Sequence, residues 1–360
     1  MKVLIVTGGT GGHIYPALSF ADLIKDRYKD AEILFVGNQG RMESSLVPKA
    51  SYAFVGLNTK SITGSIFHRL IGYVQLFQHS QQIDEIFKTF KPDWCIGFGG
   101  YVSVPVLNHA FKLKVPYFIH EQNAFVGKAN RLLSKHAQSV FASYQENLKV
   151  LPINKSFIYG NPRSYSIKSK ADKTILKDLG LSSKKKTVLF VMGSQGAESL
   201  YDLSIKVMHN LDQEDVQCIF VTGQKYFDEF LKRCKDTENI KIVPYIDQIS
   251  AMREIDLMVT RGGATTASEI ALLGIPSIIV PSPFVPNNHQ YYNAKALNDA
   301  KAARLFEENK LSFEGLTQSI LELLNNAELR KEMSLSALNM AKPQAAQDML
   351  DHIMKEISYE

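Results

Sequence analysis

Glycine-rich loops that follow apolar, strand-like segments are the first feature of this sequence that could support chemistry. The earliest spans residues 7–13, reads TGGTGGH and directly follows the apolar run 2–6. Because its four glycines lack a Cβ atom, their backbone N–H groups can approach an anion at the start of the next helix. The loop lacks the Gly-Lys-Ser/Thr of a P-loop and the glycine spacing of a dinucleotide fingerprint. It therefore predicts an anion-binding turn of another type, or only a tight connection between a strand and a helix.

His13 ends this loop at the predicted ligand edge. A neutral imidazole in that position could take a proton from an attacking hydroxyl group. The alternative is a histidine whose ring nitrogens are satisfied by hydrogen bonds in the protein core.

Two similar loops occur in the second half of the chain. The segment 193–197 reads GSQGA, and the segment 262–269 reads GGATTASE. Small and hydroxyl side chains at a helix start can bind a diphosphate. Glu269 lies one turn into the helix, where it could accept two ribose hydroxyls or serve only as a cap. Gln290 is a neutral hydrogen-bonding residue that suits sugar hydroxyls or a polar helix start.

Polar residues also follow two strand-like segments of the first half. The segment 97–103 reads GFGGYVS, and the segment 120–124 reads HEQNA. His120 and Glu121 could take part in catalysis, or they could form a buried, hydrogen-bonded pair.

Short strands that alternate with helices must position these loops. Continuous apolar runs, rather than alternating ones, are typical of parallel strands covered by helices on both faces. The alternation recurs in both halves and predicts an α/β protein with two Rossmann-like, doubly wound parallel sheets, whose ligands bind at the carboxyl ends of the strands. Strands are expected at 2–6, 33–36, 94–98, 117–120, 187–192, 217–222, 240–244, 257–260 and 277–280, and helices include 16–28, 199–210 and 268–273.

The chain is expected to form two domains. Residues 160–173 carry glycine, proline, serine and lysine without apolar periodicity, which predicts a linker. The expected division is 1–162 and 163–342, followed by a closing helix over 343–360.

Composition excludes several classes of protein. The 360 residues are 45% hydrophobic and 21% charged, and no run of 18 apolar residues is present, so we expect a globular protein without a membrane-spanning helix. Three scattered cysteines argue against a disulfide framework or a structural zinc site. The apolar run at the start is too short for a signal peptide, so we expect a cytoplasmic protein.

Positive charge is concentrated in the first half of the chain. Residues 1–165 hold 18 lysines and arginines against 10 acidic residues, and the remainder holds 23 against 26. A basic half suits an anionic lipid or an anionic substrate. Nucleic acid is not expected as a partner, because no nucleic-acid-binding pattern is present.

Seven ordered motifs resemble those of the MurG family, the bacterial N-acetylglucosaminyltransferases that convert lipid I to lipid II. The motifs are GGTGGH, GFGGYVS, HEQNAFVGKANRLLS, GNPR, GSQGA, GGATTASE and HQYYNA, and they span residues 7–293. The resemblance implies a GT-B fold, UDP-GlcNAc as the donor, and lipid I as the acceptor. It also implies a peripheral location on the cytoplasmic side of the cell membrane, with roles in peptidoglycan synthesis, cell shape and cell division.

The resemblance also assigns site residues. Arg163 corresponds to an arginine that stands one place later in many relatives, and position 289 is a histidine where some relatives carry glutamine. Ile246 corresponds to a contact to uracil, Glu269 to a contact to ribose, and Gln290 to a contact to the GlcNAc. The donor-binding set is Thr10, Gly11, Gly12, Asn123, Arg163, Ser194, Ile246, Ala264, Thr265, Thr266, Ala267, Ser268, Glu269 and Gln290, and the acceptor-side set is Tyr101 and His120.

The expected mechanism is a single displacement with inversion at C1. No DxD motif is present, so we expect no metal and no cofactor, with helix N-termini stabilising the diphosphate instead. His13 is the leading candidate for the general base, and Glu121 is a rival or a supporting partner. The alternatives are another GT-B enzyme, such as a UDP-GlcNAc epimerase or a glycolipid synthase, and a non-catalytic membrane adaptor.

One apolar stripe is a candidate surface for docking to an anionic membrane. It lies within residues 66–77, beside Lys60, His68 and Arg69. Apolar insertion next to basic residues is how a peripheral helix holds an anionic leaflet. The alternative is that the stripe packs on the first sheet. Its members are Ile66, Phe67, Leu70, Ile71 and Val74.

Overall fold

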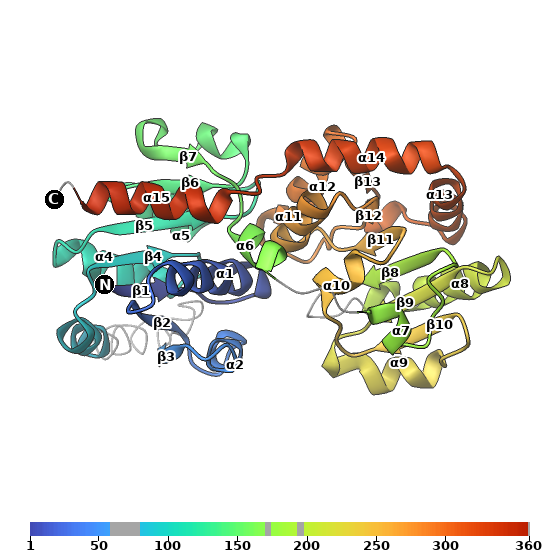
Figure 1. Cartoon of the computed structure of the whole chain (residues 1–360), viewed down its shortest axis with the longest axis horizontal. Helices are drawn as coiled ribbons and strands as arrows, with labels where there is room; N and C mark the ends of the chain where they lie inside the picture. The colour runs from blue at the N-terminus through green and yellow to red at the C-terminus, as the bar shows by residue number, and fades with distance from the viewer. Residues whose placement is uncertain (58–79, 170–173, 193–197, 359–360) are drawn as a thin grey trace, which may run out of the picture. The chain divides into compact units, whose positions relative to one another are not determined.

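The computed structural model describes residues 1–57, 80–169, 174–192 and 198–358. The chain forms two compact units, which are described separately (Figure 1). The first comprises residues 1–168 together with 342–360, and the second comprises residues 169–341. The first unit thus continues past the expected boundary at residue 163, and it also includes the C-terminal residues 342–360.

The first unit is built on a parallel sheet of seven strands in the order β3-β2-β1-β4-β5-β6-β7. β1 (Lys2–Val6) lies in the middle, with Val3 paired to Ile33 on one side and to Trp94 on the other. Its apolar residues are fully buried, as expected for a strand covered on both faces. The other strands are β2 (Glu32–Asn38), β3 (Ala53–Leu57), β4 (Trp94–Gly97), β5 (Tyr117–Glu121), β6 (Val140–Ala142) and β7 (Ser156–Ile158).

Helices cover both faces of this sheet, and two separate apolar cores lie between the sheet and the helices. Residues 80–90 are also helical. The remaining helices are α1 (Gly11–Arg27), α2 (Glu43–Lys49), α4 (Ser103–Lys112), α5 (Lys128–Leu133), α6 (Arg163–Ser169) and α15 (Ala345–Ile357), with 3-10 turns η1 (Gln145–Lys149) and η2 (Ile153–Lys155).

The second unit repeats the plan with six parallel strands in the order β10-β9-β8-β11-β12-β13. Its strands are β8 (Thr187–Val191), β9 (Gln217–Val221), β10 (Ile240–Val243), β11 (Leu257–Thr260), β12 (Ser277–Ile279) and β13 (Arg304–Leu305). Its helices are α7 (Ile175–Asp178), α8 (Tyr201–Gln213), α9 (Phe227–Arg233), α10 (Gln248–Met252), α11 (Ala264–Leu273), α12 (His289–Asp299), α13 (Phe313–Asn325) and α14 (Ala327–Met340), with 3-10 turns η3 (Glu198–Leu200), η4 (Gln224–Tyr226), η5 (Pro286–Asn288) and η6 (Glu308–Lys310).

The strand orders confirm the expected fold class, two doubly wound parallel sheets. In each sheet the order reverses beside the first strand, between β1 and β4 and between β8 and β11. Loops at such switch points are the preferred ligand sites of open α/β sheets. All nine expected strands are present, whereas β3, β6, β7 and β13 were not expected.

Two expected boundaries are wrong. α1 begins at Gly11 rather than near Pro16, because the backbone N–H groups of His13 and Ile14 already bond the carbonyl of Thr10. The expected linker 160–173 contains helix α6. Ser19 of α1 fixes this segment, since its hydroxyl donates to the Pro162 carbonyl at 2.7 Å. Residues 170–173 lie outside the described part of the chain.

The closing helix α15 packs on the first unit, beside α1 (Figure 1). Met349, Leu350 and Ile353 are fully buried in the same core as Phe20 of α1. Burying these side chains gives the end of the chain a structural role in the first unit.

Truncating this contact should destabilise the first unit. Leu350→Ala is expected to lower its free energy of unfolding by about 2–5 kcal/mol, because a cavity opens in the core. Trp94, the one tryptophan of the chain, belongs to this core, so its fluorescence during urea unfolding reports on the first unit. The control Leu335→Ala, on the exposed side of α14, should change stability by less than about 0.5 kcal/mol. An unchanged Trp94 transition in Leu350→Ala would show that α15 does not stabilise this unit.

Candidate functional site

The first glycine loop connects β1 to α1 at the switch point of the first sheet. Gly9 has a φ of +103°, a conformation that favours glycine. Thr10 precedes the helix in an extended conformation, and its side chain does not cap α1. Thr10 is exposed and Gly11 and Gly12 are half-buried, so the first-turn backbone lies near the surface, as an anion site at a helix N-terminus requires.

His13 is held by its own loop. Its Nδ1 lies 2.8 Å from the carbonyl oxygen of Gly8, so in the neutral ring Nδ1–H donates and Nε2 carries the lone pair. Gly99 closes over the ring from the loop after β4, and a Cβ there would lie 3.0 Å from Nε2. The ring is half-buried. This contact selects the neutral tautomer in which Nδ1 carries the hydrogen and Nε2 does not.

Glu121 is buried at the end of β5 and accepts several hydrogen bonds. Its carboxylate accepts from the Asn123 backbone N–H at 3.0 Å, the Gly127 backbone N–H at 2.9 Å and Asn130 Nδ2 at 2.9 Å. Burial raises the pKa of Glu121, although these donors oppose the shift. The carboxylate shapes the loop 121–130 and holds Asn123, whose Nδ2 also donates to it. Of the two candidate bases, Glu121 is buried and engaged by donors of its own loop, whereas His13 is half-buried.

The two acceptor-side candidates differ in exposure. His120 is fully buried beside the ring of Phe98, and its Nε2 lies 2.9 Å from the Gly160 carbonyl oxygen. Burial lowers the pKa of His120 to about 4, so the ring is neutral near pH 7. The structure thus places His120 inside the unit, where it supports residue 160, rather than on an acceptor-facing surface. Tyr101, by contrast, is 74% exposed after β4.

Arg163 begins α6 and belongs to the first unit. Its backbone N–H donates to Asn161 Oδ1 at 3.0 Å, and its guanidinium carbon lies 5.2 Å from the centroid of the Tyr15 ring on α1. The residue therefore lies beside the first glycine loop's helix, and not in the second unit, to which the expected boundary assigned it.

The second unit presents Gly262 and Gly263 between β11 and α11. Gly263 precedes α11 in an extended conformation and, as a glycine, has no side chain that could cap that helix start. Gly262 approaches α12 so closely that a Cβ atom would lie 2.2 Å from the carbonyl oxygen of Gln290. Asn293 reinforces the contact by donating from Nδ2 to the Gly262 carbonyl at 3.0 Å. The starts of α11 and α12 are thus fixed against each other.

The side chains on these two helix starts are partly accessible. Thr266 and Ser268 are half-buried, whereas Ala264, Thr265 and Ala267 are buried. Gln290 is half-buried, and its Oε1 accepts from the Ser282 backbone N–H at 2.9 Å.

Glu269 lies deeper than its expected role suggested, with 2% of the residue exposed. Gln248 of α10 donates to its carboxylate from Nε2. Ile246, two residues before Gln248, is half-buried against the core of the second unit. Glu269, the expected ribose contact, is thus hydrogen-bonded to Gln248, which lies two residues after Ile246, the expected uracil contact.

Two buried charged residues were not expected from the sequence. Arg261, directly after β11, pairs with Glu308 and donates to the Val280 carbonyl at 3.0 Å. Glu43 at the start of α2 is fully buried below the first glycine loop. The arginine could have been found from its place between a strand and two glycines, but no local pattern singles out Glu43.

Ser194 and the stripe from Ile66 to Val74 lie outside the described residues, so their expected roles remain predictions. Within the described ranges, no group of three or more His, Cys, Asp or Glu side chains is arranged to hold a metal ion. Of the helices described, none is long and apolar enough to cross a bilayer.

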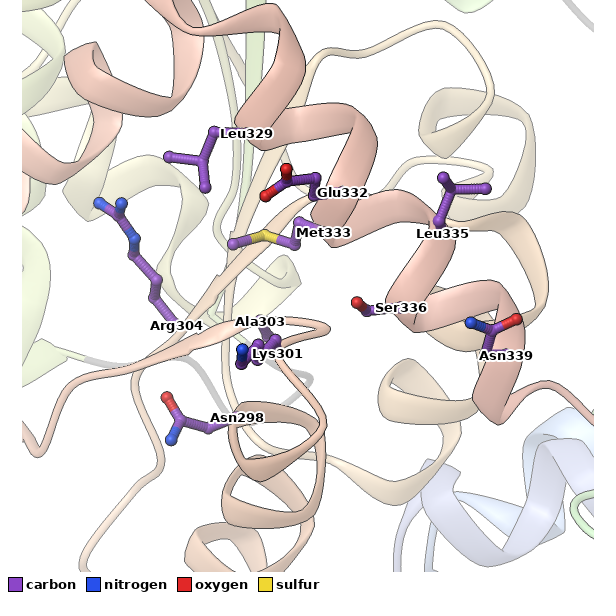
Figure 2. A pocket seen from close by; sticks show the side chains of 10 residues that line it. All are labelled: Asn298, Lys301, Ala303, Arg304, Leu329, Glu332, Met333, Leu335, Ser336 and Asn339. Atoms are coloured by element: carbon purple, nitrogen blue, oxygen red, sulfur yellow. The ribbon is translucent and has the colours of Figure 1, made fainter.

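A cavity of about 560 Å³ lies away from these loops, in the second unit (Figure 2). It lies between α14 and residues 298–304, which lead into the amino end of β13, whereas the glycine loops follow the carboxyl ends of strands. None of the expected site residues lines it. Its lining is Asn298, Lys301, Ala303, Arg304, Leu329, Glu332, Met333, Leu335, Ser336 and Asn339.

Comparisons with known proteins define the class of this chain. Residues 3–142 match the N-terminal domain of glycosyltransferase family 28, and residues 187–349 match its C-terminal domain. The two matches fall on the two sheets described above. The fold and the paired glycine loops are thus those of a two-domain sugar-nucleotide glycosyltransferase.

The relatives are more specific. The chain is 39% identical to the UDP-N-acetylglucosamine--N-acetylmuramyl-(pentapeptide) pyrophosphoryl-undecaprenol N-acetylglucosamine transferase of Clostridioides difficile, over 99% of this chain and 89% of that protein. It is 27% identical to the crystal structure of MurG from Acinetobacter baumannii, with a TM-score of 0.74 over 99% of this chain and 100% of that one. The chain belongs to the MurG family of N-acetylglucosaminyltransferases.

A UDP-GlcNAc 2-epimerase from Neisseria meningitidis has a similar structure, with a TM-score of 0.72 over 99% of this chain and 100% of that one. Its sequence identity is 14%, so this similarity shows the fold alone.

Gly262→Ala should disturb the contact between α11 and α12. Its methyl group would overlap the Gln290 carbonyl oxygen, and overpacking of this kind costs about 1–3 kcal/mol. We expect calorimetry to show a melting temperature of the second unit lowered by about 2–10 °C. The adjacent control is Gly263→Ala, because the nearest atom to a Cβ there is Thr266 Oγ1 at 3.9 Å and its φ is −68°. Equal melting temperatures for the two variants would contradict the close approach at Gly262.

Proposed function

We propose that this chain transfers N-acetylglucosamine from UDP-GlcNAc to the muramoyl C4 hydroxyl group of lipid I, forming lipid II with inversion at C1. The observation that carries the catalytic part of the proposal is the bond from His13 Nδ1 to the Gly8 carbonyl oxygen. Since it leaves Nε2 as the basic nitrogen, His13 can accept the proton of the acceptor hydroxyl as that oxygen attacks C1.

The leaving UDP gains negative charge as the bond to C1 breaks. The start of α11 suits this charge, because its N-cap residue is a glycine and two glycines let the donor approach the backbone. Metal-independent transfer is therefore part of the proposal. Thr10, Gly11 and Gly12 offer a second helix start of this kind, at α1.

The other donor contacts are proposed from their places in the family motifs. Ile246 packs on uracil, and Gln290 binds the GlcNAc through its amide. The Glu269 carboxylate, to which Gln248 already donates, also accepts from the ribose hydroxyls. Asn123, held by Glu121 in the loop after β5, and Arg163, beside Tyr15 of α1, are further donor contacts proposed on the first unit. The remaining donor contacts proposed are Ser194 and the residues Ala264, Thr265, Thr266, Ala267 and Ser268 at the start of α11.

His13→Ala tests the catalytic part of the proposal. With UDP-GlcNAc and a lipid I analogue, kcat should fall about 10²–10⁴-fold, because the general base is lost. The affinity for UDP, measured by calorimetry, should change little, since backbone N–H groups hold the diphosphate. A folded variant with nearly full activity would refute the role of His13.

The same assay separates the alternatives. An epimerase would convert UDP-GlcNAc in the absence of the lipid acceptor, whereas the proposed transferase requires that acceptor. A non-catalytic adaptor would show neither activity.

We further propose that the first unit docks on an anionic membrane surface from the cytoplasmic side. Residues 112–155 hold seven lysines and arginines, against Glu121, which is buried, and Glu146. Large apolar side chains are exposed on the same elements. They are Phe111 and Leu113 at the end of α4, Leu132 on α5 and Ile153 on η2.

Contacts show that these elements share one surface. Phe111 stacks on His136, with ring centroids 4.4 Å apart. Lys155 Nζ donates to the Lys135 carbonyl at 2.9 Å, which joins the segment of Ile153 to the end of α5. Exposed apolar groups among basic residues favour a lipid interface, where each basic residue contributes about 1 kcal/mol. The stripe at Ile66, Phe67, Leu70, Ile71 and Val74 remains a separate candidate for membrane contact, proposed from the sequence alone.

A double variant tests this docking surface. Phe111→Ser with Leu113→Ser should lower the affinity for vesicles that contain anionic lipid by about tenfold or more, because a buried large apolar side chain contributes about 1.5–3 kcal/mol. Leu335→Ser with Leu338→Ser, two exposed leucines of α14, is the matched control and should bind normally. Equal binding of both double variants in a vesicle sedimentation assay would argue against docking through α4.

A further inference from the structure

Glu43 is a buried carboxylate to which the activity above assigns no role. It begins α2, and it is fully buried below the glycine loop that follows β1. Its Oε1 accepts from the backbone N–H of Asn38 at 2.9 Å and from Asn38 Nδ2 at 3.0 Å. Its Oε2 accepts from the backbone N–H of Gly9 at 3.3 Å. A buried charge is tolerated when hydrogen bonds satisfy it in this way.

The space for this carboxylate is made by glycines. A Cβ atom on Gly8 would lie 2.9 Å from Glu43 Oε1, and one on Gly37 would lie 2.7 Å from Glu43 Cγ. Gly8, just after β1, and Gly37, near the end of β2, thus leave room for Glu43 because they have no side chain.

One peptide group connects Glu43 to His13. The Gly9 N–H that donates to Glu43 and the Gly8 carbonyl oxygen that accepts from His13 Nδ1 belong to the same amide. The order of groups is therefore carboxylate, amide N–H, amide C=O and imidazole Nδ1–H. Hydrogen bonds in such a chain polarise one another, so the anion at one end strengthens the bond at the other.

We propose that Glu43 is the positioning residue of His13 and acts through the peptide that joins Gly8 to Gly9. The proposal rests on the proposed role of His13 as the general base. A peptide between two glycines has little intrinsic preference for one orientation, because both residues reach positive and negative φ. Glu43 holds the N–H toward α2, which directs the carbonyl toward His13. That carbonyl can only accept, so it selects the Nδ1–H tautomer and leaves Nε2 basic.

The first test reads the tautomer of His13 without turnover. In the wild-type chain with ¹⁵N-labelled histidine, NMR should show Nδ1 protonated and Nε2 unprotonated in neutral His13. Glu43→Gln replaces the carboxylate by a neutral amide with one oxygen and one NH2 group. The Gly9 N–H then faces either a neutral oxygen or an NH2 group, and it loses its anionic acceptor. The Nε2–H tautomer should then become populated. An Nε2–H tautomer in the wild-type chain would overturn the proposal, even if Glu43→Gln does not fold.

The second test is kinetic. Glu43→Gln should lower kcat about 10- to 100-fold, the scale found for groups that orient metal-bound histidines, with a smaller change in KM for UDP-GlcNAc. In the His13→Ala background the same substitution should have less than about a twofold effect on kcat, because the two residues act as one unit. If the fold reductions in kcat of the two single variants multiply in the double variant, Glu43 does not act through His13.

Glu254→Gln is the matched control. Glu254 in the second unit also accepts two backbone N–H groups, those of Ile175 and Leu176, at 3.1 and 2.9 Å. We expect it to leave the His13 tautomer and kcat unchanged. If His13→Ala retains activity while the tautomer still depends on Glu43, the general-base role fails and the positioning contact stands. If His13 proves essential but its tautomer is the same in Glu43→Gln, the positioning role of Glu43 is refuted and the general-base role of His13 is retained.

Discussion

Close approach of backbone to backbone at the carboxyl ends of the strands is the constraint on which both candidate sites depend. In the first unit Gly100, with a φ of +89°, approaches Gly8 so closely that a Cβ atom would lie 2.7 Å from the Gly8 carbonyl oxygen. In the second unit Gly262 approaches the Gln290 carbonyl in the same way. Such contacts let two loops from different strands form one surface, and they expose backbone N–H groups there. The glycines are therefore needed for packing as well as for ligand approach.

Buried carboxylates hold the loops that the glycines make flexible. Glu43 holds the loop after β1, Glu121 the loop after β5, and Glu269 joins α11 to Gln248 of α10. Each accepts hydrogen bonds from neighbouring segments, which offsets the cost of burying its charge. Since a loop rich in glycine loses much conformational entropy on folding, several strong bonds from one anchor are needed to give it a single conformation. The acidic side chains of these sites thus order the backbone before any substrate binds.

Patterns in the sequence predicted most of the fold, because buried parallel strands leave continuous apolar runs such as Lys2–Val6 and Leu257–Thr260. The three-residue strands β6 and β7 and the two-residue β13 were missed, since such short segments carry no periodicity. The sequence also located the glycine loops and His13. It left open whether His120 is buried. It did not reveal that α6 docks on α1 through Ser19 or that Glu43 lies below the first loop, because those contacts join residues far apart in the chain.

The two units share a strand order but differ in the chemistry at their switch points. In the first unit the loop after β1 is followed by His13, whose Nδ1 is already engaged, so that unit holds a group able to accept a proton. In the second unit β11, the strand that corresponds to β4, is followed by Arg261, which is buried against Glu308 and the Val280 carbonyl. A guanidinium held in this way fixes the strand end from which Gly262 and Gly263 emerge. In the proposed reaction the first unit supplies the base, His13, and the second unit supplies the backbone site for the diphosphate at the start of α11.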